Sequence, residues 1–460
     1  MSAPRHRRPP ARNGAWLAAA TLLLAAGTAA ANTLGTWGGS VDAAFGTAAN
    51  WAATPLGSGT VDASINLPGA AVGLASGDAA VGGLDLGAAG TMATLTLGGG
   101  GAPSAGTLAT GADGVVVGSL DIAARAGTVA DPSYAGSGLL TQYSGTLANG
   151  GNLYLGAALK ADTGSGTYAF GLTAAEAASR FGLSGAAAVQ AAAPVYRTTA
   201  AAASAAAVFI GRNGSGASGP MGTEELRLQG YGTFQAGGAL QAYPFGATSA
   251  SPGTATLRVV GGNEVIRFNT LATGTGANVG FLMGVDVNGN GTQGSGAILA
   301  VTLDGTGLGV TDAYQSLSAA GASGTLIPNT VGVSTIFVNG QATLGNGFAT
   351  AATSPAFQLT LGAGFSAALG QTFDILLTGQ GRTTGGINGF FDYGGLLLGQ
   401  GGTIVLGGYT FAADYGAGVA NAFDLRVTAV PVPEPGSGAL LAGAALAALL
   451  PRCRRRERRP

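Results

Sequence analysis

Residues 136–156 read Gly-Ser-Gly-Leu-Leu-Thr-Gln-Tyr-Ser-Gly-Thr-Leu-Ala-Asn-Gly-Gly-Asn-Leu-Tyr-Leu-Gly, and this stretch decides the expected fold. Short runs of aliphatic, aromatic and threonine residues alternate in it with glycine-rich turns, which is the pattern of short strands. Glycine suits the corners between such strands because it adopts positive φ without strain. Two or three strands in about 20 residues are typical of one turn of a parallel β-helix.

The same theme recurs along the body of the chain. Strand-like runs lie at 93–98, 114–118, 153–156, 208–211 and 254–260, and a degenerate echo of the quoted unit lies at 230–240. Gly-Ser-Gly corners lie at 136–138, 164–166 and 214–216. A single coil cannot bury its apolar face, so neighbouring coils must stack. We therefore predict an all-β chain folded as a right-handed parallel β-helix. The competing fold is a tandem of β-sandwiches, whose strands should be longer and more evenly spaced.

One alanine-rich segment, at about 172–207, breaks this pattern. Thr173 and Glu176 have the spacing of a capping box, and Glu176 and Arg180 have that of an i,i+4 ion pair. We expect a helical excursion at about Thr173–Phe181, on a loop that bulges from one edge of the solenoid. The remainder, including Ala200–Ala207, is either helical or disordered.

Composition excludes several classes of protein. The chain has 460 residues, 85 glycines, 47% hydrophobic and 9% charged residues, which argues against charge-driven disorder. The glycines show no G-X-Y period, which excludes collagen. The only histidine is His6 and the only cysteine is Cys453, both in the terminal segments. The body thus excludes Ser-His-Asp and Cys-His catalysis and any His- or Cys-ligated zinc or haem. We expect no catalytic residue, no metal site and no cofactor.

The near-zero net charge conceals an acidic body. Ten of the 20 basic residues lie in the two terminal segments, whereas only Glu434 and Glu457 of the 21 acids do. The intervening body therefore carries 10 basic and 19 acidic residues, a net charge of −9. Such a body has no basic stripe for nucleic acid and would repel polyanions in the absence of bound cations.

The N-terminus has the three parts of a secretory signal. Arg5, Arg7, Arg8 and Arg12 form a basic region, an apolar run follows from Trp16, and Ala29 and Ala31 offer an A-x-A cleavage site. We expect export by Sec-type machinery and removal of residues 1–31, with an uncleaved N-terminal anchor as the alternative.

The C-terminus has a three-part pattern of its own. Pro433-Glu434-Pro435 is a stiff, helix-free segment, and residues 436–450 form a mostly apolar run. The chain then closes with an arginine cluster made of Arg452, Arg454, Arg455, Arg456, Arg458 and Arg459. About 15 apolar residues fall short of a comfortable membrane span, and the arginines should stay cytoplasmic.

This pattern resembles the PEP-CTERM sorting signal of bacterial exosortase substrates. The resemblance implies a C-terminal transmembrane sorting helix, transient residence in the inner membrane, and recognition of Pro433-Glu434-Pro435 by a membrane-embedded exosortase. An ordinary C-terminal anchor with a proline-rich stalk is the alternative.

Aromatic and aliphatic residues mark both ends of the body. At the start, Trp37 and Trp51 are expected to be aromatics that cap the first coil, rather than ligand-stacking residues. Near the end, alternate residues are expected to point inward in two runs, Phe373, Ile375 and Leu377 and then Phe423, Leu425 and Val427, which predicts antiparallel strands that close the far end. Both ends resemble those of exported β-solenoid proteins of the autotransporter type. The expected organisation is a signal at 1–31, a solenoid body at 32–333, a β cap region at 334–430 and the sorting signal at 431–460.

Several candidate sites do not withstand scrutiny. Residues 286–292 match the start of an EF-hand loop, but Ala297 occupies the position of its bidentate glutamate. Residues 214–219 match G-x-G-x-x-G, but Pro220 follows where a helix should begin. Glu224 and Glu225 are adjacent and would point to opposite faces of a strand. Three isolated aspartates are interpreted as turn residues: Asp85, Asp121 and Asp304. Five arginines of the body form no cluster with acidic residues in the sequence: Arg125, Arg212, Arg227, Arg258 and Arg267.

Together these features predict a non-enzymatic exported protein of the cell surface or extracellular matrix. Its expected role is structural or adhesive, in a biofilm-type matrix with exopolysaccharide as a candidate partner. The alternatives are a secreted polysaccharide-active β-helix enzyme, which needs two carboxyl groups in one groove, and a calcium-stiffened adhesin.

Overall fold

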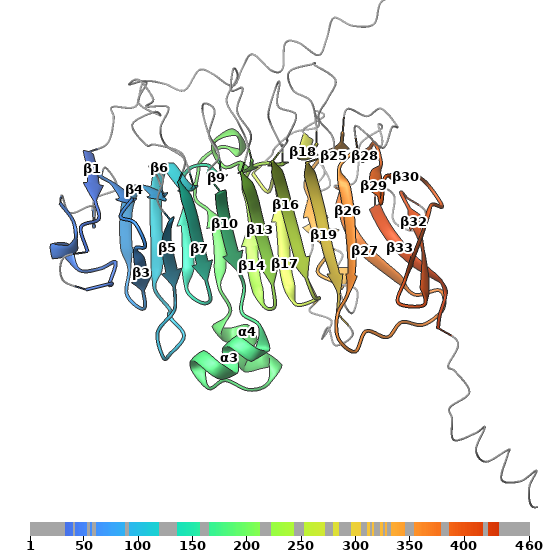
Figure 1. The fold of residues 1–460 in the computed structure, drawn as a ribbon, viewed down its shortest axis with the longest axis horizontal. Helices are drawn as coiled ribbons and strands as arrows, with labels where there is room; N and C mark the ends of the chain where they lie inside the picture. Colours follow the sequence, from blue (N-terminus) through green and yellow to red (C-terminus); the bar gives the residue numbers. More distant parts are fainter. Residues whose placement is uncertain are drawn as a thin grey trace, which may run out of the picture.

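The computed structural model describes residues 33–39, 42–52, 56–57, 61–87, 92–118, 136–156, 165–211, 222–242, 253–271, 279–284, 296–304, 311–312, 315–316, 323–324, 327–328, 333–345, 354–378, 386–416 and 422–431. This part of the chain is mostly β, with parallel-rich sheets and two α-helices. Figure 1 shows the strands side by side along the long axis, from blue at the N-terminal end to red at the C-terminal end. The chain thus forms a β-solenoid-like stack.

One side of the stack is a ten-stranded sheet, which is parallel up to its last pair of strands. In spatial order it contains β3 (Ala71–Leu74), β5 (Met92–Leu97), β7 (Ser137–Gln142), β10 (Ser165–Phe170), β13 (Thr223–Gln229), β16 (Thr254–Val260), β19 (Ala297–Leu303), β26 (Ala356–Leu361), β29 (Phe391–Tyr393) and β30 (Leu396–Leu398).

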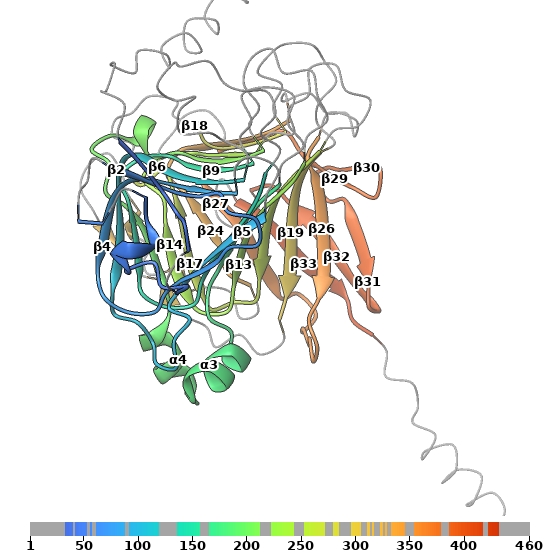
Figure 2. The ribbon, with the colours of Figure 1, turned by 60° about the vertical axis from the view of Figure 1, so that its left-hand side comes forward.

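The other strands of the coils belong to a nineteen-stranded sheet, which consists of two parallel ladders and three antiparallel strands at the C-terminal end (Figure 2). The first ladder runs through β4 (Ala79–Leu86), β6 (Thr107–Val117), β8 (Thr146–Asn149), β11 (Val195–Thr198), β14 (Gly232–Gln235), β17 (Glu264–Phe268), β24 (Ile336–Val338) and β27 (Thr372–Thr378). The second ladder runs through β1 (Thr33–Thr36), β2 (Val61–Ile65), the later parts of β4 and β6, β9 (Leu153–Leu155), β12 (Val208–Ile210), β15 (Leu240–Ala242), β18 (Val279–Met283), β25 (Gln341–Leu344) and β28 (Ile387–Asn388).

Each coil visits the ten-stranded sheet, then the first ladder, then the second. The quoted unit is one such coil, β7–β8–β9, and Gly145 and Gly156 turn its corners at φ of 77° and 63°. The predicted period near 20 residues is wrong for most of the stack. Consecutive coils begin at Ala71 and Met92 near the N-terminus, but at Ala297 and Ala356 farther along, because long connections separate the later strands.

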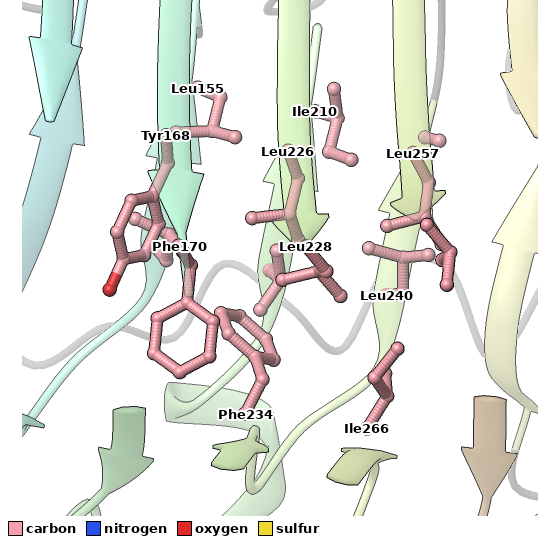
Figure 3. Close-up of a cluster of buried hydrophobic side chains, with 14 of the residues drawn as sticks. Leu155, Tyr168, Phe170, Ile210, Leu226, Leu228, Phe234, Leu240, Leu257 and Ile266 are labelled. Carbon is pink, nitrogen blue, oxygen red and sulfur yellow. The ribbon is translucent and has the colours of Figure 1, made fainter. Parts of the chain in front are cut away.

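The core lies inside the coils, because alternate residues of every ladder point inward. In the ten-stranded sheet, one inward row is in register across six coils and is fully buried: Leu95, Leu140, Tyr168, Leu226, Leu257 and Leu299. Figure 3 shows side chains from neighbouring coils meeting in this interior. Phe234 stacks on Tyr196 with ring centroids 4.3 Å apart and meets the edge of Phe170 at 5.5 Å.

The interior also contains satisfied polar groups. Thr110, Asn149 and Tyr196 stand on three successive coils of the first ladder. The Thr110 hydroxyl donates to Asn149 Oδ1 at 2.7 Å, and Asn149 Nδ2 donates to the Tyr196 hydroxyl at 3.0 Å. Burial raises the pKa of Tyr196 to about 12, so its hydroxyl stays protonated. The network therefore links coils in a fixed register without placing a charge inside.

The first coil is closed by the two tryptophans, as predicted. Trp37 and Trp51 are buried and pack edge to face with ring centroids 5.0 Å apart, and Trp51 also packs on Phe45. The Trp51 indole N–H donates to the Phe45 carbonyl at 3.1 Å. A short 3-10 helix, η2 (Ala48–Asn50), leads into this cluster. Both rings are thus used for packing at the N-terminal end.

The predicted helical excursion is present between β10 and β11. It contains α3 (Ala174–Phe181) with the full Thr173–Glu176 capping box, and it continues into α4 (Ala186–Ala192). Figure 1 shows both helices projecting from one edge of the stack. The rest of the alanine-rich segment forms β11, η3 (Ala203–Ala205) and β12. The open choice between helix and disorder thus resolves as mixed short elements.

The predicted Glu176–Arg180 ion pair is wrong. The Glu176 carboxylate instead accepts hydrogen bonds from the backbone N–H and the hydroxyl of Thr173. Arg180 reaches the neighbouring coil, where its guanidinium lies 3.8 Å from the Tyr143 ring centroid and donates to the Tyr143 hydroxyl at 2.9 Å. Capping occupies the glutamate, and the arginine docks the excursion on the stack.

Replacing Thr173 by alanine is expected to destabilise α3 by about 1 kcal/mol, because the capping hydroxyl is lost. Hydrogen exchange of the α3 amides should accelerate, while exchange in β10 and β11 stays unchanged. Ser179→Ala, an exposed change on the same helix, is the control and should have little effect. Equal acceleration in both variants would contradict the assigned role of the cap.

The far end is closed by antiparallel strands, β31 (Thr403–Leu406), β32 (Tyr409–Asp414) and β33 (Ala422–Ala429). β33 lies between β32 and β27 and is antiparallel to both. The parallel coils run on past residue 334 as far as β28 and β29. Two further short antiparallel pairs join β20 (Thr311–Asp312) to β23 (Ile327–Pro328) and β21 (Gln315–Ser316) to β22 (Ser323–Gly324).

The predicted inward residues of this end are confirmed with one exception. Phe423, Leu425 and Val427 lie in the main core, as do Phe373 and Ile375. The exception is Leu377, which packs in a separate cluster with Phe337 and Ala422. A register shift between Asp374 and Leu376 explains it. A bulge inserts one residue, so Leu376 enters the core and Leu377 turns to the other face.

Candidate functional site

The outer face of the ten-stranded sheet presents two adjacent in-register rows in which threonine, alanine and charged residues predominate. The first row contains Thr94, Leu139, Thr167, Glu225, Thr256 and Ile298. The second contains Thr96, Thr141, Ala169, Arg227, Arg258 and Ala300. Most of these residues are partly exposed. We call this surface the threonine face.

An ion-pair cluster stands in the middle of the threonine face. Arg227 Nε lies 2.6 Å and Arg258 Nε 3.1 Å from Glu225 Oε1, and the two arginines are direct neighbours on β13 and β16. Their side chains keep 42% and 33% of their surface exposed. A shared carboxylate offsets the repulsion expected between like charges on neighbouring strands. The cluster carries a net charge of +1 and keeps guanidinium surface for a ligand.

This cluster was missed in the sequence because Arg258 is 33 residues from Glu225. The sequence indicates only the pair of Glu225 and Arg227, because residues two apart in a strand lie on the same face. Glu224 and Glu225 do point to opposite faces, as predicted, since Glu224 is fully buried. The threonine face thus offers hydroxyl and guanidinium donors but only one carboxylate, whereas glycoside hydrolysis needs two.

Two further glutamates lie inside the coils rather than on this surface. Glu224 fills space beside Gly156, where a Cβ on the glycine would lie 2.2 Å from the glutamate Cγ. Glu264 begins β17, and its backbone N–H donates to the Ser334 hydroxyl at 3.0 Å. Burial raises the pKa of Glu264 well above its usual value, so the neutral acid is favoured. These side chains are structural parts of the interior.

A row of aspartates crosses the cap. Asp374 on β27 lies opposite Asp424 on β33, which lies opposite Asp414 on β32. We call these three residues the acid row. Asp424 is only 3% exposed, and its Oδ1 is buried without a hydrogen-bond partner. Gln400 Nε2 donates to Asp414 at 2.9 Å.

The acid row has distinctive electrostatics. Burial, the nearby Asp374 and Asp414, and a side-chain hydrogen bond with Asp374 raise the pKa of Asp424 from 3.8 to about 7. The outer two aspartates lie two strands apart, roughly 9.5 Å in a sheet, so the three carboxylates form a line and do not converge on one ion. In agreement, no group of three acids, histidines or cysteines in the described ranges is arranged to hold a metal ion.

The aspartates interpreted as turn residues have different outcomes. Asp85 is buried within β4, so that interpretation is wrong for it. Asp304 directly follows β19, as a turn residue would. The described residues include neither Asp121, Arg125 and Arg212 nor the stretches at 214–219 and 286–292.

The predicted sorting and processing residues also lie outside the described residues. These are Ala29 and Ala31 of the cleavage site, Pro433, Glu434 and Pro435 of the sorting motif, and Arg452, Arg454, Arg455, Arg456, Arg458 and Arg459 of the cytoplasmic cluster. None of the helices that the structure describes has the length and apolar character needed to cross a bilayer.

Comparisons with known proteins identify no relative. No protein-family model, curated protein or solved structure matches this chain.

Proposed function

We propose that this chain is an exported, non-enzymatic structural or adhesive protein of the cell surface or extracellular matrix. The observation that supports it best is the uninterrupted stack of coils with the threonine face along one side. A repeating flat surface suits contact with a long polymer better than capture of a small molecule. Exopolysaccharide is the polymer we propose, with hydroxyl and guanidinium groups of the threonine face as its donors.

The finer fold class belongs to the same proposal. We infer a right-handed parallel β-helix, because connections between parallel strands of one sheet are right-handed in most proteins. The autotransporter-like character of the body rests on the resemblance of its two ends. Closed ends suit an exported rod, since open solenoid ends expose edges that promote aggregation.

Sorting is the second part of the proposal. An N-terminal secretory signal and a terminal Pro-Glu-Pro, apolar and arginine sequence support export through Sec-type machinery. The chain would reside transiently in the inner membrane, with its arginine cluster in the cytoplasm. An exosortase would then read Pro433-Glu434-Pro435, and the body would reach the surface or matrix.

Replacing Pro433, Glu434 and Pro435 together by alanine is expected to leave the protein in the inner membrane with its C-terminal tail intact. The stiff segment that the exosortase would recognise is then absent. Intact mass shows whether the C-terminal tail is retained, and cell fractionation shows where the protein resides. Both are measured in cells with and without the exosortase.

The control is Glu457→Ala, which removes the other acid of the same terminal segment and should be processed normally. Normal release of the triple variant would contradict the sorting proposal. Retention of the full tail by the unaltered protein in both strains would indicate an ordinary anchor.

A further inference from the structure

The acid row lies where the last described strand, β33, joins the stack of coils. Its central member, Asp424, stands on β33, the last strand of the described chain. β33 is held on one side by β27, which belongs to the parallel coils, and on the other by β32. From the end of β33 the chain continues through Val430 and Pro431 toward Pro433-Glu434-Pro435. β33 therefore joins the stack to the C-terminal segment.

The pairing of Asp374 with Asp424 favours a proton on one of the two. They lie directly opposite each other on β27 and β33, and two ionised carboxylates in such a cross-strand pair repel each other. Asp424 is the better proton carrier, because it is the buried member and its Oδ1 has no partner to stabilise a charge. With that proton the central member of the row is neutral.

Among the residues that the structure describes, no cation forms an ion pair with Asp424. The groups facing Asp424 are Asp374 from β27 and Asp414 from β32, both acidic. On β33 itself, Arg426 lies two positions along the same face and is exposed. Within the described ranges, the ion pairs are those of Glu225 with Arg227 and Arg258, and none involves Arg426. A charged Asp424 would thus stand buried between two acids.

We propose that the acid row is a proton-dependent latch, which holds β33 in the cap while Asp424 is protonated and loosens β33 when that proton is lost. Its ligand is the proton itself. In a mildly acidic medium β33 stays bound between β27 and β32. In an alkaline medium repulsion within the row opens β33.

The sign of the pH dependence follows from linkage. Asp424 has a raised pKa of about 7 in the folded cap, compared with 3.8 for an ordinary aspartate. The folded state thus binds more protons than the opened state between these values. The stabilisation is fully present below about pH 4 and is lost as the pH rises through about 7.

Hydrogen exchange of the β33 amides in the full-length protein tests whether loss of the Asp424 proton loosens β33. Asp424→Asn serves as the reference at each pH, because asparagine keeps the shape and can donate a hydrogen bond to Asp374 without titrating. Comparison at equal pH cancels the intrinsic pH dependence of exchange. Between about pH 5.5 and about pH 8.5, the exchange rate of the unaltered protein relative to this variant should rise roughly tenfold or more.

Two further variants sharpen the test. Asp374→Asn should also reduce the pH dependence, because it supplies a donor and removes one of the charges that oppose ionisation of Asp424. Asp304→Asn removes one acid at the end of β19, outside the row, and should leave the dependence unchanged. An exchange ratio that is the same at both pH values would overturn the latch. Protection at alkaline pH that appears only with added calcium would also overturn it, since the row would then bind a metal ion.

Discussion

Replacing Phe234 by alanine is expected to lower the free energy of unfolding by about 3–5 kcal/mol, because the change removes a large buried ring and leaves a cavity. Phe234 is fully buried and contacts aromatic rings on the two neighbouring coils. It stacks on Tyr196, meets Phe170 edge to face, and lies 5.8 Å from Phe268. Its loss should separate the coils on which the excursion and the threonine face depend.

Urea denaturation followed by circular dichroism of the full-length protein measures this effect as a shift of the midpoint. Phe390→Ala is the control, since the Phe390 ring is only partly buried and packs on Tyr415 with centroids 5.0 Å apart. A shift for Phe234→Ala no larger than that of the control would show that the aromatic interior is not the main source of stability.

Replacing Gly171 by alanine is expected to cost more than about 4 kcal/mol, through a steric clash rather than a lost contact. Gly171 follows β10 with φ of 120°, and a Cβ there would lie 1.8 Å from the carbonyl oxygen of Gln229 and 2.7 Å from Glu264 Oε1. The first of these atoms is backbone of the next coil, which cannot move without breaking its own ladder. We expect low yield of folded protein and local loss of exchange protection in β13 and β17.

Gly182→Ala is the matched control for this change. Gly182 ends α3 with a φ of 65°, and nothing lies within 4 Å of the position its Cβ would take. The alanine should cost only about 1 kcal/mol, the ordinary penalty for a left-handed conformation. Equal destabilisation by the two substitutions would mean that backbone conformation, not the approach of the coils, governs the Gly171 corner.

The proton-dependent latch and the proposed sorting involve different parts of the molecule, and each can be disproved without the other. The latch depends on contacts of Asp424 within the cap, which exchange measurements detect in purified protein. The proposed sorting depends on residues 431–460 and would be detected by the mass of the protein and its location in the cell. Altered processing of Asp424→Asn in cells would connect the two proposals, because β33 leads directly into the segment for which sorting is proposed.

Local patterns predicted the elements of this fold well, because strand alternation, turn glycines and helix caps act within a few residues. The quoted coil has its strands where the aliphatic runs lie, and its glycines Gly145 and Gly156 have positive φ. The Thr173–Glu176 capping box forms as its spacing predicts. Two tryptophans near the start of the body close the first coil. The coil period failed because connection lengths between strands follow no local rule.

The sequence did not predict which side chains contact one another between neighbouring coils. Arg180 joins Tyr143 instead of Glu176, since only packing of the excursion brings that ring within reach. Arg258 meets Glu225 because two strands from different coils align in register. The acid row exists because β33 inserts between β27 and β32, and a bulge in β27 sends Leu377 away from the core.

The sequence by itself thus determined that this is a β-rich chain of stacked coils with an acidic body free of histidine and cysteine. The patterns at its termini lead to the proposal of export and sorting. The tertiary structure alone decided which side chains share a face: the threonine face, its arginine cluster and the acid row. The physical reason is that short strands specify their own alternation, whereas contacts between parallel coils depend on the lengths of the connections that set their register.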